Sequence, residues 1–196
     1  AKAGYFVAKG YIFVSLNYRL LPKPDPLIQA ADIARGIAHI QANAAKWGGN
    51  QSKIVLMGSG AGGHLAALLS SNPSLASDQG ASSWAGAVVL ETAALNVPAL
   101  MSTSHDSVYD TAFGSSMEFW AHALIDTSGV PILVVCSTES EEDTCSKATA
   151  FKQAADAQGV SVTVSPQSVD PAQINSRVGA STAYTDAIES YIASIL

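Results

Sequence analysis

Five short runs of apolar and β-branched residues, each bounded by glycine, proline or polar positions, predict five β-strands. They occupy residues 11–18, 53–57, 84–91, 130–136 and 160–164. The first run lies between Gly10 and a cluster of three prolines, which indicates a buried strand that ends abruptly. The last run alternates apolar and polar residues, as a strand does when one of its faces is less buried.

Helical spacing of apolar residues separates these runs. The longest stripe comprises Ile33, Ile37, Ile40, Ala44 and Trp47. Shorter stripes predict helices after Gly63, before Gly159 and at the C-terminus. Because strands and helices alternate, we expect an α/β fold with a mostly parallel, doubly wound sheet and helices on both faces. We expect one domain over residues 1–196, with a cap-like excursion near residues 93–129, where the pattern is irregular.

The charge distribution narrows the range of partners. The 196 residues include 10 Lys and Arg against 16 Asp and Glu, for a net charge of −6, and the basic residues are scattered singly. Such a surface cannot neutralise a run of phosphates, so we expect neither nucleic acid nor an anionic membrane as a partner. No apolar run approaches the roughly 20 residues of a membrane span, so we expect a soluble chain. Secreted and cytoplasmic locations both remain open, as does the oligomeric state.

Two cysteines, Cys136 and Cys145, lie on opposite sides of a polar loop and could be free or paired. Free thiols are favoured, because most cysteines outside small secreted proteins behave as small buried apolar side chains.

A cluster of glycines follows the second predicted strand and opens a predicted helix. Gly58, Gly60 and Gly63 satisfy the GxGxxG pattern of dinucleotide-binding proteins, and Glu91 ends the next strand, where a carboxylate could bind ribose hydroxyls. However, Glu91 lies well beyond the usual spacing of about 20 residues, and this pattern normally opens the first βαβ unit.

The same residues also fit the G-x-S-x-G nucleophile elbow of serine hydrolases. Gly58 and Gly62 are then the flanking glycines, and Gly60 stands where the serine should be. The neighbouring Ser59 is a poor substitute, because Met57 and Ala61 occupy the positions on either side of it that an elbow requires to be small.

Segments along nearly the whole chain resemble the α/β-hydrolases of the carboxylesterase and lipase type. The resemblance rests on Asn17-Tyr18-Arg19-Leu20, Asp32 and Arg35, Trp47-Gly48-Gly49-Asn50, residues 61–67, Val130-Pro131-Ile132-Leu133 and Ile174-Asn175. It implies an α/β-hydrolase fold, here lacking its first strands, one of which normally lies between the strands at residues 11–18 and 53–57. Either further strands lie upstream of this sequence, or these two strands pair directly in a smaller sheet.

The resemblance also assigns four positions of the site. Gly60 occupies the nucleophile position, Asp143 is the retained catalytic acid, Pro171 occupies the position of the base, and the N–H of Ala61 is one oxyanion donor. The family's second donor comes from a His-Gly-Gly loop that this sequence does not contain. No histidine occurs in residues 160–196, so two members of the Ser-His-Asp triad are absent from the expected places.

The remaining histidines have structural roles as the favoured interpretation. We expect His39, His64 and His122 to pack within or beside helices, whereas His105, beside two aspartates, is a minor candidate for a displaced base. Neither the histidines nor the carboxylates have zinc-ligand spacing, so we expect no metal and no cofactor. The acidic residues 139–143 fit a solvated helix start better than a calcium loop. Arg19 and Asp32 are predicted to form a buried ion pair.

The sequence thus favours an ester-hydrolase scaffold with weak or no catalysis. One alternative is a non-catalytic protein that binds a small-molecule ester or acid, or a partner peptide, in the former substrate cleft. The other alternative is a dinucleotide-dependent oxidoreductase that uses the glycines at residues 58–63.

Overall fold

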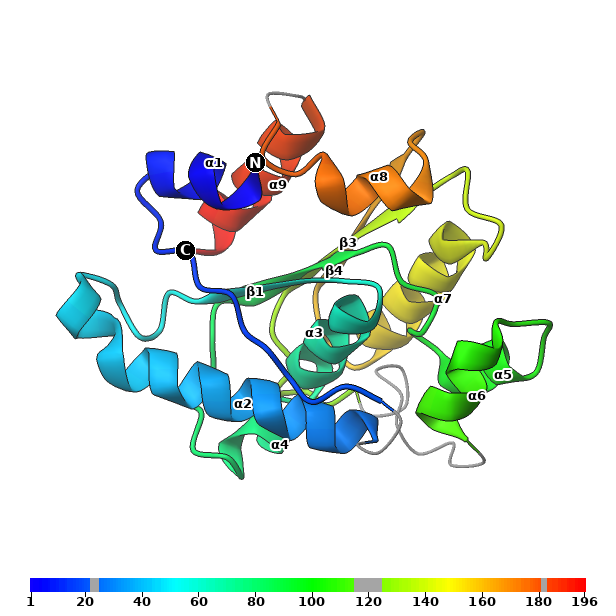
Figure 1. Cartoon of the computed structure of the whole chain (residues 1–196), viewed down its shortest axis with the longest axis horizontal. Helices are drawn as coiled ribbons and strands as arrows, with labels where there is room; N and C mark the ends of the chain where they lie inside the picture. Colours follow the sequence, from blue (N-terminus) through cyan, green and yellow to red (C-terminus); the bar gives the residue numbers. More distant parts are fainter. Residues whose placement is uncertain (22–24, 115–124, 181–182) are drawn as a thin grey trace.

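A computed structural model describes residues 1–21, 25–114, 125–180 and 183–196 (Figure 1). Its sheet has four strands in the order β1-β2-β3-β4, and every neighbouring pair is parallel. The strands are β1 (Val55–Ser59), β2 (Gly86–Leu90), β3 (Ile132–Ser137) and β4 (Val162–Gln167). The predicted α/β fold with a parallel sheet is therefore confirmed.

Helices cover both faces of this sheet (Figure 1). The described helices are α1 (Lys2–Ala8), α2 (Pro26–Asn43), the 3-10 helix η1 (Ala44–Trp47), α3 (Ala61–Ser71), α4 (Ser74–Ser77), α5 (Val97–Met101), α6 (Ser107–Phe113), α7 (Thr144–Ala157), α8 (Pro171–Ser176) and α9 (Ala183–Ile195). Helices α1, α8 and α9 pack on one face, and α2, α3 and α7 pack on the other.

The two central strands, β2 and β3, are the ones whose apolar runs are most continuous in the sequence. Every residue of β2 and β3 is buried, because helices cover both faces of these strands. Val88 and Leu90 contribute to the core beneath α8 and α9, whereas Ala87 and Val89 contribute to the core beneath α3 and α7. Successive side chains of a strand point to opposite faces, so both faces of β2 and β3 place apolar side chains in a core. The sequence of each strand is therefore a continuous apolar run.

The predicted strand at residues 11–18 is wrong. The described residues 12–20 belong to no strand, and their amides and carbonyls make no backbone–backbone hydrogen bond. A strand needs a hydrogen-bonded neighbour, and β1 does not pair with this segment. The segment lies beside α2 and η1 instead: Leu16 packs against Gly36 of α2, and Ile12 packs against Gly49, which follows η1.

The expectation of free thiols is also wrong. Cys136 near the end of β3 and Cys145 in the first turn of α7 form a disulfide with a Cα–Cα distance of 5.2 Å. The turn from β3 into α7 brings the two cysteines together, which their separation of nine residues alone does not establish.

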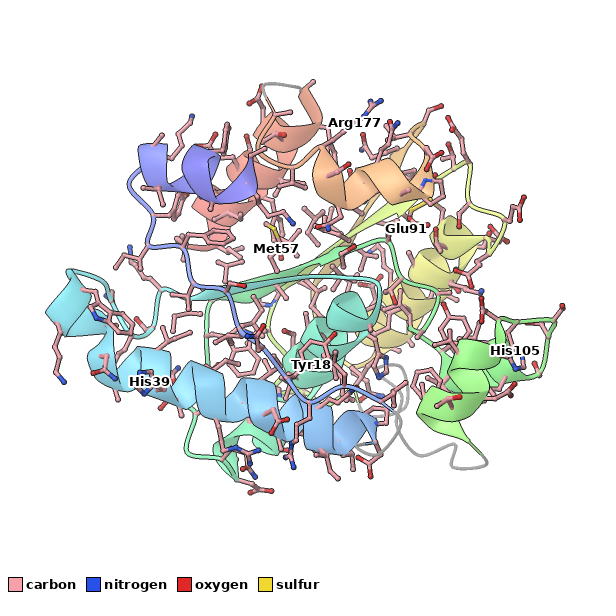
Figure 2. The ribbon with its side chains drawn as sticks, in the orientation of Figure 1. Tyr18, His39, Met57, Glu91, His105 and Arg177 are labelled. Atoms are coloured by element: carbon pink, nitrogen blue, oxygen red, sulfur yellow. A yellow bond between two sulfur atoms is a disulfide. The ribbon has the colours of Figure 1, made fainter. Side chains whose placement is uncertain are left out.

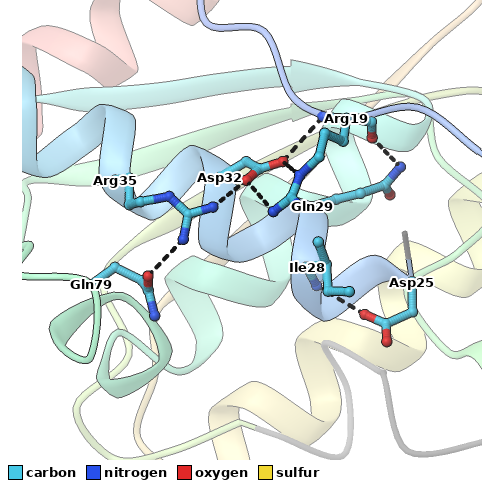
Figure 3. A network of polar contacts seen from close by, with 7 residues as sticks. All are labelled: Arg19, Asp25, Ile28, Gln29, Asp32, Arg35 and Gln79. Carbon is cyan, nitrogen blue, oxygen red and sulfur yellow. Dashed lines mark hydrogen bonds and ion pairs between the residues drawn. The ribbon is translucent and has the colours of Figure 1, made fainter. Parts of the chain in front are cut away.

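The predicted ion pair between Arg19 and Asp32 is present, but it is not buried (Figure 3). The Arg19 side chain is 62% exposed, and its Nη2 lies 2.8 Å from Asp32 Oδ1. The Arg19 amide also donates to Asp32, and Arg35 forms a second ion pair with the same carboxylate. The guanidinium of Arg19, and then Arg35, hold the pKa of Asp32 well below its usual value. These contacts fasten the extended segment to α2.

The irregular region after β2 contains α5 and α6, which enclose a small cluster of apolar side chains of their own. Its cap-like role stays a prediction, and His122 lies outside the described residues. Among the described residues, no helix combines the length and the hydropathy needed to cross a bilayer.

Candidate active site

The turn from β1 into α3 holds Gly60 in an unusual backbone conformation, with φ 55° and ψ −120°. Its N–H donates to the carbonyls of Leu90 at 3.2 Å and Glu91 at 3.0 Å, and its own carbonyl accepts from His64 N–H at 3.0 Å. A Cβ built on Gly60 would meet no atom of the described residues within 4 Å. The turn therefore directs position 60 into open space at the carboxyl edge of the sheet, which is where an elbow presents its nucleophile.

Gly58 is required by close packing within this turn. A Cβ at Gly58 would lie 2.0 Å from the carbonyl oxygen of Gly62, a distance that the backbone could tolerate only by moving. A Cβ at Gly62 would meet no atom within 4 Å, so the tight approach constrains only the first of the two flanking glycines. The predicted tight strand-to-helix turn is thus present, with a specific cause for its glycine.

Ala61 is the first residue of α3 and is exposed. The N–H groups in the first turn of a helix have no acceptor within the helix, and they form the positive end of its dipole. The Ala61 N–H thus remains a candidate oxyanion donor, and this role stays a prediction.

Glu91 joins the Gly60 turn to the loop after β3. One carboxylate oxygen accepts from the Ser137 amide at 2.6 Å, and the other accepts from Thr144 Oγ1 at 2.9 Å. Glu91 has a φ of 45°, which is uncommon for a residue other than glycine, and its carbonyl accepts the Gly60 N–H. Figure 2 shows Glu91 at the edge where the strands end.

This arrangement differs from the ribose-binding role that the dinucleotide hypothesis gave to Glu91. Both of its carboxylate oxygens already accept hydrogen bonds from the protein. The charge of Glu91 also acts on Tyr184, whose pKa is raised first by burial and then by this carboxylate. Glu91 is therefore a structural carboxylate of the sheet edge, and the oxidoreductase hypothesis loses its ribose ligand.

Asp143 and Pro171 each stand at the start of a helix on the same edge of the sheet. Asp143 is the N-cap residue of α7 in a left-handed conformation, with φ 49° and ψ 48°, and its exposed side chain makes no capping hydrogen bond. Pro171 is the first residue of α8, after the N-cap residue Asp170. The roles of Asp143 as acid and of Pro171 as the vacated base position stay predictions.

Hydrogen bonds connect these strand ends without bringing the predicted site residues into contact. Gly60 bonds to Glu91, Glu91 bonds to Ser137, and Ser137 Oγ donates to the carbonyl of Val169 at 2.5 Å, two residues before Pro171. The described structure contains no direct hydrogen bond or ion pair among Gly60, Asp143 and Pro171. Hydrogen bonds therefore link the strand ends at this edge of the sheet, whereas Gly60, Asp143 and Pro171 are not bonded to one another.

His64 has the packing role that the sequence favoured. Its Nδ1 lies 2.7 Å from the carbonyl of Ala94, its ring packs edge-on against Phe113, and Nε2 is buried without a hydrogen-bond partner. Burial lowers its pKa, and only the Ala94 carbonyl opposes this shift. The ring is therefore buried and engaged by one backbone contact and by Phe113, which fits a packing role.

His105 has both ring nitrogens engaged within its own segment, and its role as a displaced base stays a prediction. Its Nδ1 lies 2.6 Å from the carbonyl of Thr103 and its Nε2 lies 3.2 Å from Asp110 Oδ1, so both ring nitrogens face acceptors. The Thr103 carbonyl first, and then Asp110, raise its pKa, which favours the imidazolium. His39 is exposed and packs beside Trp47, and Figure 2 shows His39 and His105 on other elements than Glu91.

The acidic loop before α7 binds hydroxyl groups of the protein. Glu139 accepts from Ser168 at 3.1 Å, and Glu142 accepts from Tyr109 at 3.2 Å. Within the described ranges, no group of three His, Cys, Asp or Glu side chains is arranged to hold a metal ion. A shallow cavity of about 340 Å³ opens along α7 and is lined by Cys145, Ser146, Thr149, Ala150 and Gln153, none of which is a predicted site residue.

Sequence reasoning missed two features of this site. It assigned Glu91 only a ligand role, although the carboxylate joins positions 46 and 53 residues away. It also favoured free thiols, although the disulfide joins the residues directly beside Ser137 and Thr144. The position of Glu91 at a strand end was the available signal, since strand ends of a parallel sheet converge on one edge.

The chain is similar to known esterases in part of its sequence and in its fold. Esterase LipQ of Mycobacterium tuberculosis is 41% identical over 62 residues, which is 32% of this chain but only 15% of LipQ. The lipase/esterase of Lactobacillus plantarum has a similar fold, with a TM-score of 0.70 and 18% identity over 97% of this chain and 78% of that chain. Esterase B of Lactobacillus rhamnosis, in a structure with a tributyrin phosphonate inhibitor, gives a TM-score of 0.67 at 19% identity over 91% and 64% of the two chains.

The matched region covers 15% of LipQ, so the chain spans only a small part of this curated relative. The solved structures, at 18% and 19% identity, establish the fold alone. The family model BD-FAE, however, matches residues 2–171, which include all four strands, the Gly60 turn and both loops of the sheet edge. Together with the esterase relatives and carboxylesterase-like fold, this match shows that the chain belongs to the BD-FAE family and has an α/β-hydrolase fold of the carboxylesterase type.

Proposed function

We propose that this chain is an ester-hydrolase scaffold that has kept the nucleophile turn and lost the catalytic nucleophile and base. One observation carries the proposal: the turn that presents position 60 into open space, in a conformation that other residues rarely adopt, holds a glycine. Glycine at this position keeps the backbone conformation at little energetic cost but supplies no hydroxyl.

Ester hydrolysis by acyl transfer requires three chemical roles. A serine oxygen attacks the acyl carbon, a histidine accepts and returns its proton, and an acid orients the histidine. Asp143 is the candidate for the third role, and the Ala61 N–H is the candidate for stabilising the oxyanion. Removing serine or histidine from such a triad lowers kcat by about a millionfold, so the remaining groups supply only the residual effects of binding and the oxyanion hole.

The position that the family's base would occupy, Pro171 at the start of α8, also supports the loss of the triad. Pro171 has no titratable side chain, and the sequence contains no histidine beyond His122. The described histidines are enclosed, bonded at both nitrogens or distant on α2. Ser59 is the last residue of β1, and the residue that the turn presents to open space is Gly60.

Hydrolysis of p-nitrophenyl acetate and butyrate tests the proposal. The wild-type chain is expected to release p-nitrophenol no faster than a folded variant with Asp143 replaced by alanine. Asp156→Ala, an exposed aspartate near the end of α7, serves as the control for loss of a surface charge. Turnover typical of an esterase that is abolished by Asp143→Ala and retained by Asp156→Ala would refute the proposal.

Binding without turnover is a second candidate function of this site. The open space at position 60 adjoins the first turn of α3, whose free N–H groups suit the oxygen of an ester or a carboxylate. Melting temperatures measured with acetate, butyrate and their methyl esters distinguish the two functions. A saturable rise that is lost in Gly60→Val, which fills the open space, supports binding; an unchanged melting temperature with every ligand refutes it.

A further inference from the structure

The disulfide between Cys136 and Cys145 lies beside the hydrogen bonds that hold the carboxyl edge of the sheet. Ser137 follows Cys136, and its amide donates to one carboxylate oxygen of Glu91 at 2.6 Å. Thr144 precedes Cys145, and its hydroxyl donates to the other oxygen at 2.9 Å. One covalent link and two hydrogen bonds therefore join the end of β3 to the start of α7.

The two cysteines differ in how far solvent reaches them. Cys136 lies in β3 with 1% of its surface exposed, within the core beneath α3 and α7. Cys145, in the first turn of α7, is only partly buried where it packs against the same core. It also lines the shallow cavity of about 340 Å³ along this helix. A molecule in this cavity therefore meets the disulfide at the sulfur of Cys145.

The cavity beside this sulfur is small and has a polar lining. Its volume of about 340 Å³ lies at the lower end of the range of small-molecule sites. Ser146 and Gln153 are exposed on its wall, and within the described part of the chain their side chains make no hydrogen bond. Thr149 Oγ1 donates to the carbonyl of Cys145 at 2.9 Å, and Ala150 adds only a methyl group. The lining therefore suits a small polar molecule.

Charge around the start of α7 selects among such molecules. Helix α7 has 14 residues, and the N–H groups of its first turn stabilise a thiolate there. The four acidic residues of the loop 139–143 are exposed just before this turn. Lys147 is the only basic residue between positions 139 and 151. The loop therefore repels an approaching molecule of net negative charge and attracts a positive group.

We propose that Cys145 is a site of thiol–disulfide exchange with a small thiol that carries a positive group, and that this exchange releases the start of α7. The thiolate of the small molecule attacks Sγ of Cys145 from the cavity, and the bond to Cys136 breaks as the new S–S bond forms. The sulfur of Cys136 takes the electron pair and then a proton from water. One disulfide is exchanged for another, so the step consumes no oxidant. Attack by Cys136 on the mixed disulfide reverses it.

Exchange removes the covalent link between the end of β3 and the start of α7. The two hydrogen bonds to Glu91 then hold this junction without it, while the added group on Cys145 occupies the first turn of the helix. Asp143 precedes that turn and makes no capping hydrogen bond, so it gains mobility. This switch does not depend on ester hydrolysis, because it acts through the disulfide and is read by masses and amide exchange.

Mass measurement after treatment with two thiols of similar size tests the exchange. The folded chain is incubated with excess cysteamine or mercaptoethanesulfonate, quenched with acid, unfolded and labelled with N-ethylmaleimide. The expected first product carries cysteamine on Cys145 and N-ethylmaleimide on Cys136. Each opening rate is divided by that thiol's rate with bis(hydroxyethyl) disulfide, which is uncharged, and cysteamine should then be faster by about fivefold at low salt. A closed disulfide, a first adduct on Cys136, or equal divided rates would overturn the proposal.

Two alanine-to-tryptophan variants test whether the cavity is the path of attack. Ala150→Trp fills the cavity, whereas Ala157→Trp adds the same side chain at the exposed last residue of α7. Because the rate of exchange depends on access to the sulfur, Ala150→Trp should slow opening by cysteamine at least about tenfold and Ala157→Trp should leave it unchanged. Equal rates in the two variants would show that the disulfide opens by another path, such as unfolding of the whole chain.

Amide exchange measures the release of α7. In excess cysteamine, the amides of residues 138–145 should exchange at least about tenfold faster than in the untreated chain. The amides of β1, two strands away from β3, should keep their rates. Unchanged exchange at residues 138–145 would refute the release, and equal acceleration in β1 would show that the disulfide stabilises the whole fold rather than this junction.

Discussion

Replacing Gly60 with serine separates the geometry of the turn from its chemistry. A Cβ at this position meets no atom within 4 Å, so steric contact adds no cost. The backbone conformation, φ 55° and ψ −120°, lies outside the regions that residues with a side chain normally occupy. Holding a residue there costs of order 1–3 kcal/mol, and we expect Gly60→Ser to lose about that much stability.

Gly114 provides a matched control for this strain. It ends α6 with φ 55° and ψ −138°, and among the described residues a Cβ there would approach only the carbonyl oxygen of Asp110, at 3.9 Å. Gly114→Ser should therefore lose a similar free energy of unfolding in urea. A Gly60→Ser variant as stable as the wild type, beside a destabilised Gly114→Ser variant, would refute the strained-turn reasoning.

The serine variant should remain inactive as an esterase. The hydroxyl would occupy the nucleophile position, but none of the three histidines in the described residues is bonded to the Gly60 turn through its side chain, and an unassisted serine is a weak nucleophile. We expect hydrolysis of p-nitrophenyl acetate by Gly60→Ser to match that of Gly114→Ser. A large gain in turnover confined to Gly60→Ser would show that a base is already in place and that the proposed loss of the triad is incorrect.

A cysteine at the same position reports the environment without needing a base. Both native cysteines are paired, so the variant Gly60→Cys carries one free thiol. At the N-terminus of α3, the helix dipole should lower the thiol pKa and speed alkylation by iodoacetamide at neutral pH relative to Gly114→Cys, at the C-terminus of α6. Equal alkylation rates would show that position 60 does not face the exposed start of α3.

Three further predictions follow from the contacts around the sheet edge and the ion pair. Gly58→Ala should cost about 3 kcal/mol, because its Cβ would overlap the Gly62 carbonyl, whereas Gly62→Ala should gain about 0.5–1 kcal/mol; urea unfolding measures both. The lowered pKa of Asp32 means that its contribution to stability is present above the unfolded-state value of about 4 and is lost as pH falls through the lower native value. Asp32→Asn should therefore flatten this acid loss of stability in urea titrations at successive pH values; an unchanged pH profile would exclude the Arg19 contact as its cause. Glu91→Gln replaces a charged acceptor of two hydrogen bonds by a neutral one and should cost about 1–3 kcal/mol, with faster amide exchange in the loop after β3; unchanged exchange would remove the joining role.

The sequence predicted those elements whose signal lies within their own residues. Strands β2 and β3 are apolar on both faces because each face meets a helix layer, so a continuous apolar run was sufficient evidence. The glycine pattern likewise predicted the turn, because the Gly58 contact with Gly62 spans only four residues.

The segment at residues 11–18 shows the limit of such local evidence. It has the composition of a strand, but strand formation depends on a hydrogen-bonded neighbour, and the sheet provides none beside it. The ion pair of Arg19 with Asp32 was predicted from the sequence, whereas its exposure was not, because Arg19 follows a segment that does not enter the sheet.

The candidate site was predicted by position rather than by contact. The resemblance placed Gly60, Asp143 and Pro171 at strand ends or helix starts, and the structure places all three at the carboxyl edge of the sheet. The joining role of Glu91 depends on hydrogen bonds across 46 and 53 residues, which no local pattern encodes. The folded sheet shows that the carboxylate of Glu91 accepts hydrogen bonds, whereas the side chain of Asp143 is exposed.

Treatment with a fluorophosphonate, followed by intact-protein mass measurement, tests most directly whether any serine of this chain is activated for acyl transfer. We expect the native chain to keep its mass while an active serine esterase in the same reaction is modified. Stoichiometric labelling of one serine, abolished by replacing that serine with alanine, would contradict it.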